Sequence, residues 1–242
     1  MRTLGIIGGL GPVAGAHFYQ RLTEMTPATG DADHLSTILI SDPTIPSRLK
    51  HLMGEGPSPL PQLISVARRL IGAGADMLAM PSTTTSHYHE DIQAGISVPL
   101  ISLVAAVRDA LDRDGVKTVG ILATTPTRAY QIYEAAFDEA HIHYVYPDAE
   151  TQQRVMALIS AVKGSGDRGA QVDVLAQCIR APWAESVDAV LLGCTELPVV
   201  WDSRPPHPVG QPVYSATDIL ARRVLALWQG DRQGPEPTYE GR

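Results

Sequence analysis

"GADMLAMPSTTTSH", residues 74–87, is a short apolar run followed by a loop of small hydroxyl side chains. A near-continuous apolar run of this length is typical of a strand buried on both faces in a parallel sheet. Ligands of open α/β sheets bind beyond the carboxyl ends of the strands. We therefore expect this serine and these threonines to lie at a functional edge of a sheet.

A second stretch, "VDAVLLGCTELP", repeats the pattern. When the two stretches are aligned without gaps on Asp76 and Asp188, Ser82 falls opposite Cys194. "TLGIIGG" near the N-terminus is echoed in the same way by "TVGILAT" in the middle of the chain. The alternative is that any two strands of βαβ units look alike. The echo predicts two related lobes, with both residues facing a cleft between them.

Apolar runs alternate with longer helical patterns along the whole chain, which predicts α/β lobes with mostly parallel sheets flanked by helices. We expect lobe I at residues 1–102 and 208–230, lobe II at 103–207, and a disordered tail at 231–242. The expected strands are 3–8, 36–41, 76–80, 98–101, 118–122, 143–146, 188–192 and 208–213, and the expected helices are 13–26, 60–73, 87–94, 103–113, 127–140, 149–162, 168–181 and 215–229.

Charge and composition narrow the possible partners. The 242 residues carry a net charge of −7 without a basic patch, which argues against nucleic acid and anionic membranes. No apolar run approaches the ~20 residues that cross a bilayer, and the N-terminus does not resemble a signal peptide. We expect a cytoplasmic protein.

The metal-ligating residue types are too sparse for a metal site. Cys178 lies on the apolar side of an expected helix, where we predict an inert core residue. Two cysteines make no zinc pattern, and a disulfide is not expected in a reducing compartment. His87 and His89 are two residues apart and point in different directions on a helix. We predict no metal.

Cys194 stands between a strand and a helix that we expect to begin near Thr195. A thiol at a helix N-terminus feels the positive end of the dipole, so we predict a lowered pKa and a usable thiolate. Thr195 and Glu196 are expected to cap and orient the turn. The alternative is a buried structural thiol.

Three further stretches carry candidate binding groups. "IIGGLGP" fits neither the dinucleotide fingerprint nor the P-loop; its glycines either let an anion approach the next helix or form a tight turn. Arg48 follows two prolines in "SDPTIPSR", and we expect it to project from a stiff loop and bind a carboxylate, or else to be solvated. Thr124 lies in the counterpart loop "ATTPT". Lys163 reaches either a carboxylate or solvent.

These residues and motifs resemble the aspartate/glutamate racemase superfamily, and most closely its aspartate racemase branch. The resemblance runs from "IIGGLGP" through "DPTIPSR", "GADMLAMPSTT", "ATTPT" and "LLGCTEL" to "PVYSATDI". It implies two similar α/β lobes with the active site between them, a homodimer, and no cofactor. It also implies that two cysteines on opposite sides of the substrate α-carbon remove and return its proton.

The first of these cysteines is absent here. The usual motif is Met-Pro-Cys-Asn-Thr, and this chain has Met80-Pro81-Ser82-Thr83-Thr84. Without gaps Ser82 takes the place of the cysteine, as the internal echo favours; a shift by one residue, which matches a histidine that often follows, puts Thr83 there. A hydroxyl is a much poorer proton carrier than a thiol at neutral pH, so catalysis on that side should suffer.

The resemblance also implies the substrate-binding residues. Arg48 and Lys163 would hold carboxylates, which suits a dicarboxylic acid, and Leu10 takes the place of the usual methionine. The equivalent cleft would be lined by Thr83, Thr84, Thr124, Thr195 and Glu196.

Three functions follow from these observations. The chain is expected to racemise aspartate, glutamate or a related amino acid, with Cys194 as the main thiol base and Ser82 or Thr83 as the opposite group. The alternative is a single-cysteine decarboxylase, isomerase or lyase acting on a small acid. A second alternative is a protein that binds a small carboxylate or amino acid without turnover.

Overall fold

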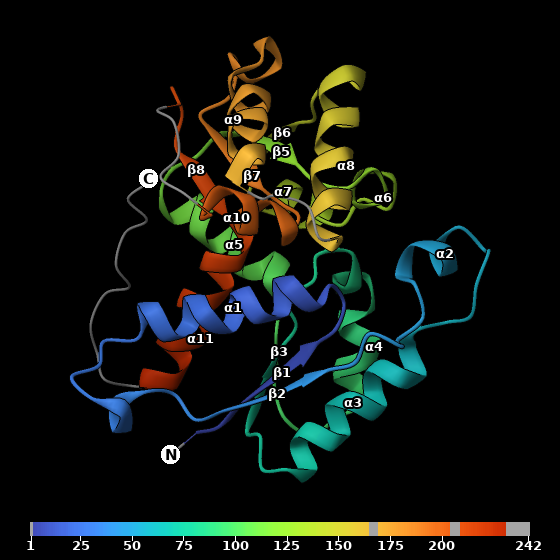
Figure 1. The fold of residues 1–242 in the computed structure, drawn as a ribbon, viewed down its shortest axis with the longest axis vertical. Coiled ribbons are helices and arrows are strands. Elements are labelled where there is room, and N and C mark those ends of the chain that lie inside the picture. The colour runs from blue at the N-terminus through green and yellow to red at the C-terminus, as the bar shows by residue number, and fades with distance from the viewer. Residues whose placement is uncertain (1, 165–168, 204–208, 231–242) are drawn as a thin grey trace. The chain divides into compact units, whose positions relative to one another are not determined.

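The computed structural model describes residues 2–164, 169–203 and 209–230. Their contacts divide the chain into two units (Figure 1). Among the described residues, unit 1 comprises those up to Ala106 and those from Leu220 to Gly230, and unit 2 comprises those from Val107 to Ile219. The division falls within two helices, α5 and α11, which span Leu103–Arg113 and Ala216–Gln229.

Unit 1 is built on a four-stranded parallel sheet in the order β2-β1-β3-β4. Helix α3 packs against β1 and β2, and it buries Leu63, Val66, Ala67 and Leu70, whose spacing places them on one helical face. The bounds of its elements are β1 Leu4–Gly8, α1 Pro12–Met25, β2 Thr37–Ser41, α2 Arg48–Leu52, α3 Leu60–Gly72, β3 Met77–Ala79, α4 His89–Ala94 and β4 Leu100–Ile101, with short 3-10 helices at Asp31–Asp33 and Thr84–Tyr88.

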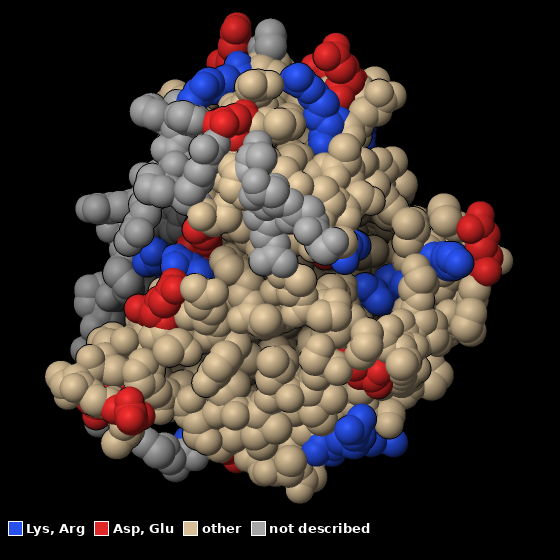
Figure 2. Space-filling model, viewed as in Figure 1, with Lys and Arg blue, Asp and Glu red and all other residues tan. Residues whose placement is uncertain are grey.

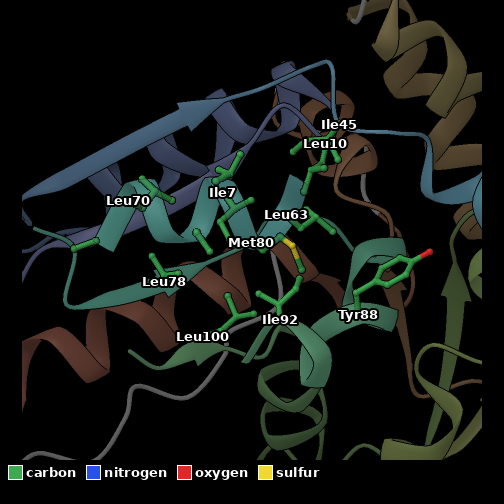
Figure 3. Packing of buried hydrophobic residues seen from close by; sticks show 13 residues of the cluster. Ile7, Leu10, Ile45, Leu63, Leu70, Leu78, Met80, Tyr88, Ile92 and Leu100 are labelled. Atoms are coloured by element: carbon green, nitrogen blue, oxygen red, sulfur yellow. The ribbon is translucent and has the colours of Figure 1, made fainter. Parts of the chain in front are cut away.

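The core of unit 1 reaches the end of the sheet at which the strands finish. Figure 3 shows Ile7, Leu78 and Leu100, contributed by three neighbouring strands, among the side chains of this core. Leu10 and Ile45, from the segments that follow β1 and β2, lie beside one another in the same cluster. The apolar cluster thus supports the loops in which candidate functional residues occur.

Unit 2 repeats the same topology, with a four-stranded parallel sheet in the order β6-β5-β7-β8. The predicted fold class, two similar lobes with parallel sheets flanked by helices, is confirmed in each unit. The bounds of its elements are β5 Thr118–Leu122, α6 Thr125–Ala129, α7 Glu134–Glu139, β6 His143–Val145, α8 Ala149–Lys163, α9 Val172–Arg180, β7 Ala189–Leu192, α10 Glu196–Trp201 and β8 Val213–Ser215, with 3-10 helices at Gly169–Gln171 and Pro182–Ala184.

The internal echo has a structural counterpart in two aspartates. An Asp76 carboxylate oxygen accepts a hydrogen bond from the Thr3 backbone N–H at 2.8 Å. Asp188 accepts one from the Thr118 backbone N–H, also at 2.8 Å. Each aspartate thereby fixes the start of one strand against the first strand of its unit. Counted along the chain, Ser82 follows Asp76 by the same number of residues as Cys194 follows Asp188.

The structure differs from the predicted division in its last part. Residues 208–230 were expected in lobe I, but β8 pairs with β7 of the second sheet, so the described residues up to Ile219 belong to unit 2. The strand itself begins at Val213, later than predicted. The predicted disordered tail, 231–242, lies outside the described residues.

One long predicted helix is interrupted. Residues 127–140 form two short helices, α6 and α7, and Gln131 between them has a positive φ of 49°. A left-handed residue ends the α-helical hydrogen-bond pattern, which explains the break. The interruption brings Tyr133 into the core, where it is fully buried.

Gly9 is the glycine on which the first loop depends. Its φ is +85°, and a Cβ atom there would lie 2.3 Å from the carbonyl carbon of Asp42. Gly9→Ala is therefore expected to lower the free energy of unfolding by about 2–4 kcal/mol, through backbone strain and a steric clash. Urea denaturation followed by circular dichroism measures this. Gly72→Ala is the matched control, because no atom lies within 4 Å of a Cβ at Gly72; equal losses in both variants would contradict the prediction.

Candidate active site

Cys194 lies two residues beyond the end of β7, in a backbone turn that is held on both sides. The Gly193 N–H donates to the Leu122 carbonyl of the neighbouring strand at 2.8 Å. The Tyr133 hydroxyl donates to the Gly193 carbonyl at 3.0 Å. A Cβ atom on Gly193 would approach the Tyr133 ring to 3.2 Å, so glycine allows this close packing. The peptide that precedes Cys194 is thus fixed by the sheet and by a buried tyrosine.

The Cys194 thiol is in contact with a buried carboxylate. Its Sγ donates to Oε2 of Glu196 at 3.0 Å. The other carboxylate oxygen, Oε1, lies 3.6 Å from Nζ of Lys163 at the end of α8. The Glu196 side chain is 5% exposed and that of Lys163 is 51% exposed. The structure therefore joins a thiol, a carboxylate and an ammonium group in one chain of polar contacts.

The predicted lowering of the Cys194 pKa is contradicted. Burial of the thiol raises its pKa well above the ordinary value, and the charge of Glu196 and the hydrogen bond to it raise the pKa further. The Lys163 charge and the Glu196 backbone N–H act in the opposite direction but do not compensate. Helix α10 begins only at Glu196 and has six residues, so its dipole is small. The resting residue is a thiol.

The predicted side-chain cap at the start of α10 is also absent. Thr195 occupies the N-cap position, but its side chain makes no cap hydrogen bond and its backbone is already helical. Thr195 is nevertheless buried next to Cys194. Thr124, two residues beyond the end of β5, does cap a helix: its hydroxyl accepts from the Thr127 N–H at 3.2 Å. Thr124 therefore contributes to the start of α6.

Tyr133 was not predicted from the sequence, because its hydrogen-bond partner Gly193 is 60 residues away. Tyr133→Phe is expected to lower the free energy of unfolding by about 1 kcal/mol, the usual contribution of one hydrogen bond. Chemical denaturation measures this loss. Tyr144→Phe, which removes a hydroxyl from β6 in the same unit, is the control. If the two variants are equally stable, the Tyr133 hydroxyl does not hold the turn.

In unit 1, Ser82 occupies the position that Cys194 occupies in unit 2. It follows β3, and it lies as many residues after Asp76 as Cys194 lies after Asp188. Its side chain is buried, with 5% of the residue exposed. Its Oγ lies 2.7 Å from Oγ1 of Thr85, and either hydroxyl is able to donate. Thr83 is buried, and Thr84 begins the 3-10 helix that leads to α4. Thr85 is a partner that sequence reasoning missed, although it lies in the quoted stretch.

Arg48 does not project from a loop as predicted. It is the first residue of α2, whose N-cap Ser47 accepts a hydrogen bond from the Lys50 N–H. The Arg48 Nη2 donates to the carbonyl of Leu10 at 2.6 Å, and Leu10 is buried. The structure thus brings together two of the predicted binding residues of unit 1. The carbonyl fixes one edge of the guanidinium group, and a fixed guanidinium group suits bidentate carboxylate binding.

The described residues contain no group of three or more His, Cys, Asp and Glu that is arranged to hold a metal ion. His89, one of the two histidines considered, instead places its Nε2 2.9 Å from the Leu100 carbonyl. Cys178 is buried in α9, as predicted. Figure 2 shows basic and acidic side chains interspersed over the described part of one face. None of the described helices is long and apolar enough to cross a bilayer.

The family model described as Asp/Glu/hydantoin racemase matches residues 7–224. Among solved structures, an aspartate racemase from Picrophilus torridus is similar to this chain, with 30% sequence identity and a TM-score of 0.82. The similarity covers 98% of this chain and 97% of that one. The matched segment includes Leu10, Arg48, Ser82 and Cys194.

Two further relatives are informative. The broad-specificity amino-acid racemase RacX of Bacillus subtilis is 26% identical over 234 residues, which is 93% of this chain and 97% of RacX. An aspartate racemase homologue from Pyrococcus horikoshii is 24% identical, with a TM-score of 0.76 over 95% of this chain and all of that one. The latter supports the fold alone.

Proposed function

Because this chain belongs to the Asp/Glu/hydantoin racemase family, we propose that it racemises a free amino acid by proton transfer at the α-carbon. The observation that carries the proposal is the buried Cys194 thiol beside Glu196 at the end of β7. The similar aspartate racemase supports aspartate, glutamate or a related amino acid as substrate. The similar broad-specificity racemase supports a wider range.

The proposed roles follow from the chemistry of each group. Cys194, as thiolate, removes the α-proton from one face and leaves a carbanion; as thiol, it returns a proton in the reverse direction. Ser82, or Thr83 next to it, carries the proton on the opposite face. These side chains suffice without a cofactor. Because a hydroxyl is a weak proton carrier, we expect one enantiomer to be turned over much faster than the other.

Substrate binding is assigned to the cations and to the polar loop residues. The Arg48 guanidinium group anchors a carboxylate, and the Lys163 ammonium group is proposed to hold a second one. The remaining proposed binding residues are Leu10, Thr84, Thr124, Thr195 and Glu196. A homodimeric state and a cytoplasmic location remain predictions.

Proton NMR in D2O tests the proposal directly. L- and D-aspartate and L- and D-glutamate are incubated with the protein, and the α-proton signal is followed together with the chirality of the product. Loss of the signal from at least one enantiomer, with formation of the mirror image, is the expected result. If none of the four amino acids exchanges its α-proton, the proposal is wrong for these substrates.

A decarboxylase with one thiol is the second candidate, and two observations favour it. Loss of CO2 leaves a carbanion that needs only a proton donor, and Cys194 rests as a thiol. The equivalent position in unit 1 holds the hydroxyl of Ser82, which is no base at neutral pH. This candidate predicts CO2 release from a malonate-like acid.

A protein without catalytic activity would only bind a small acid. Its affinity for that acid would be the same after Cys194→Ala.

A further inference from the structure

Glu196 is the residue through which the thiol and the nearest cation are connected. One carboxylate oxygen accepts from Cys194 at 3.0 Å, and the other lies 3.6 Å from Lys163. Glu196 is almost fully buried, and it is the first residue of a helix that packs against α8 and α9. Its carboxylate is therefore held in place beside the sulfur. Glu196, which is also proposed to line the substrate-binding site, thus contacts two side chains of its own unit.

We infer that Glu196 is a positioning residue that orients the Cys194 thiol and keeps it protonated between turnovers, while Lys163 limits this effect. The inference deepens the proposed function and rests on it for its catalytic meaning. Its structural content is the contact between carboxylate and sulfur, which exists whether or not the protein racemises anything.

The physical reason is repulsion between like charges away from water. A thiolate at 3.0 Å from a carboxylate would place two negative charges side by side in a buried site. While the sulfur keeps its proton, the same pair forms a charge-assisted hydrogen bond. Lys163 lies on the far side of the carboxylate, and its half-exposed side chain is screened by water. Its attraction for the thiolate therefore offsets only part of the repulsion.

The charged groups that act on the thiol are Glu196 on its own side of the turn and Lys163 from α8. Together with burial, these two groups leave the pKa of Cys194 above its ordinary value. In the direction in which Cys194 removes the α-proton, only the thiolate fraction is active, so the rate rises with pH. In the opposite direction the thiol donates, and this form is the major one at neutral pH.

The test is a titration of the thiolate by its ultraviolet absorbance in the Cys178→Ala background, where Cys194 is the remaining cysteine. Glu196→Gln keeps the size of the side chain but removes its charge. The midpoint is expected to fall by about one pH unit or more, which gives about tenfold more thiolate at a fixed pH below both midpoints. Lys163→Met is expected to raise the midpoint.

Glu139→Gln is the matched control, because it removes one carboxylate charge from unit 2 at a side chain that is 72% exposed. It should leave the midpoint unchanged. An unchanged or higher midpoint in Glu196→Gln would overturn the inference and leave burial alone as the cause. If Glu196→Gln does not fold, the opposite shift in Lys163→Met decides, and its absence overturns the inference equally.

A kinetic measurement separates this inference from the proposed function. If the protein racemises, kcat for the direction in which Cys194 is the base should rise in Glu196→Gln at neutral pH, and its pH profile should move with the thiolate midpoint. A shifted midpoint without racemisation would retain the role of Glu196 and reject the racemase. Racemisation with an unshifted midpoint would retain the racemase and reject the role of Glu196.

Discussion

Cys194→Ala is expected to lower the rate of α-proton exchange by at least about 10³-fold. The thiol is the only group of high basicity proposed to act on its side of the α-carbon, and a well-placed acid or base contributes about 10²–10⁴-fold. Loss of the thiol also removes the hydrogen bond to Glu196. Proton NMR in D2O, with circular dichroism to verify the fold, measures the effect.

The other cysteine provides the matched control for this variant. Cys178→Ala removes a thiol of the same unit from the core of α9, where it is fully buried. We expect a small loss of stability and near-normal exchange. If Cys194→Ala retains most of the exchange, or if Cys178→Ala loses as much, Cys194 is not the proton carrier.

Ser82→Cys is expected to increase racemisation by at least about tenfold. A thiol titrates far closer to neutral pH than a hydroxyl, so it is the better proton carrier on the second face. The side chain is buried and lies 2.7 Å from the Thr85 hydroxyl, so the larger sulfur atom requires a small local shift of Thr85. The gain should be greatest for the enantiomer that the wild-type protein turns over slowly. Chiral chromatography of both reaction directions measures it.

Thr83→Cys resolves the alternative that the sequence left open. It introduces the same thiol one residue later, at another buried position. A gain in Ser82→Cys alone assigns the second proton carrier to Ser82, as the internal echo favours. A gain in Thr83→Cys alone assigns it to Thr83. If neither variant gains activity while Cys194 remains essential, the hypothesis of an enzyme with a single catalytic thiol is favoured.

Much of the fold could be predicted because the decisive signals are local. The apolar runs identified all eight strands among the described residues, although β8 was placed too early. The resemblance to the racemase superfamily is confirmed by the family match. Its motifs are short, continuous and close to strand ends, so they are visible without any knowledge of the fold. The cysteine of the second motif needed no tertiary information to be noticed.

Two of the errors depended on contacts with residues far away in the sequence. Arg48 was assigned to a loop, but it begins a helix and its guanidinium group contacts the Leu10 carbonyl. Residues 209–219 were expected in lobe I but belong to unit 2, because a short strand does not reveal which sheet it joins. The break within residues 127–140 has a local cause, the left-handed backbone of Gln131, which places the neighbouring Tyr133 in the core.

The sequence by itself determined that two α/β units repeat one topology, and that Ser82 and Cys194 lie at equivalent strand ends. Periodicity and spacing are sufficient for this, because they follow from backbone geometry. Only the tertiary structure decided the ionisation of Cys194. The sequence suggested a helix dipole and a lowered pKa. The fold instead buries the sulfur against the Glu196 carboxylate, and both effects raise the pKa of Cys194. A pKa depends on water and charges in three dimensions, and although Glu196 is only two residues away, the sequence does not show that its carboxylate faces a buried sulfur.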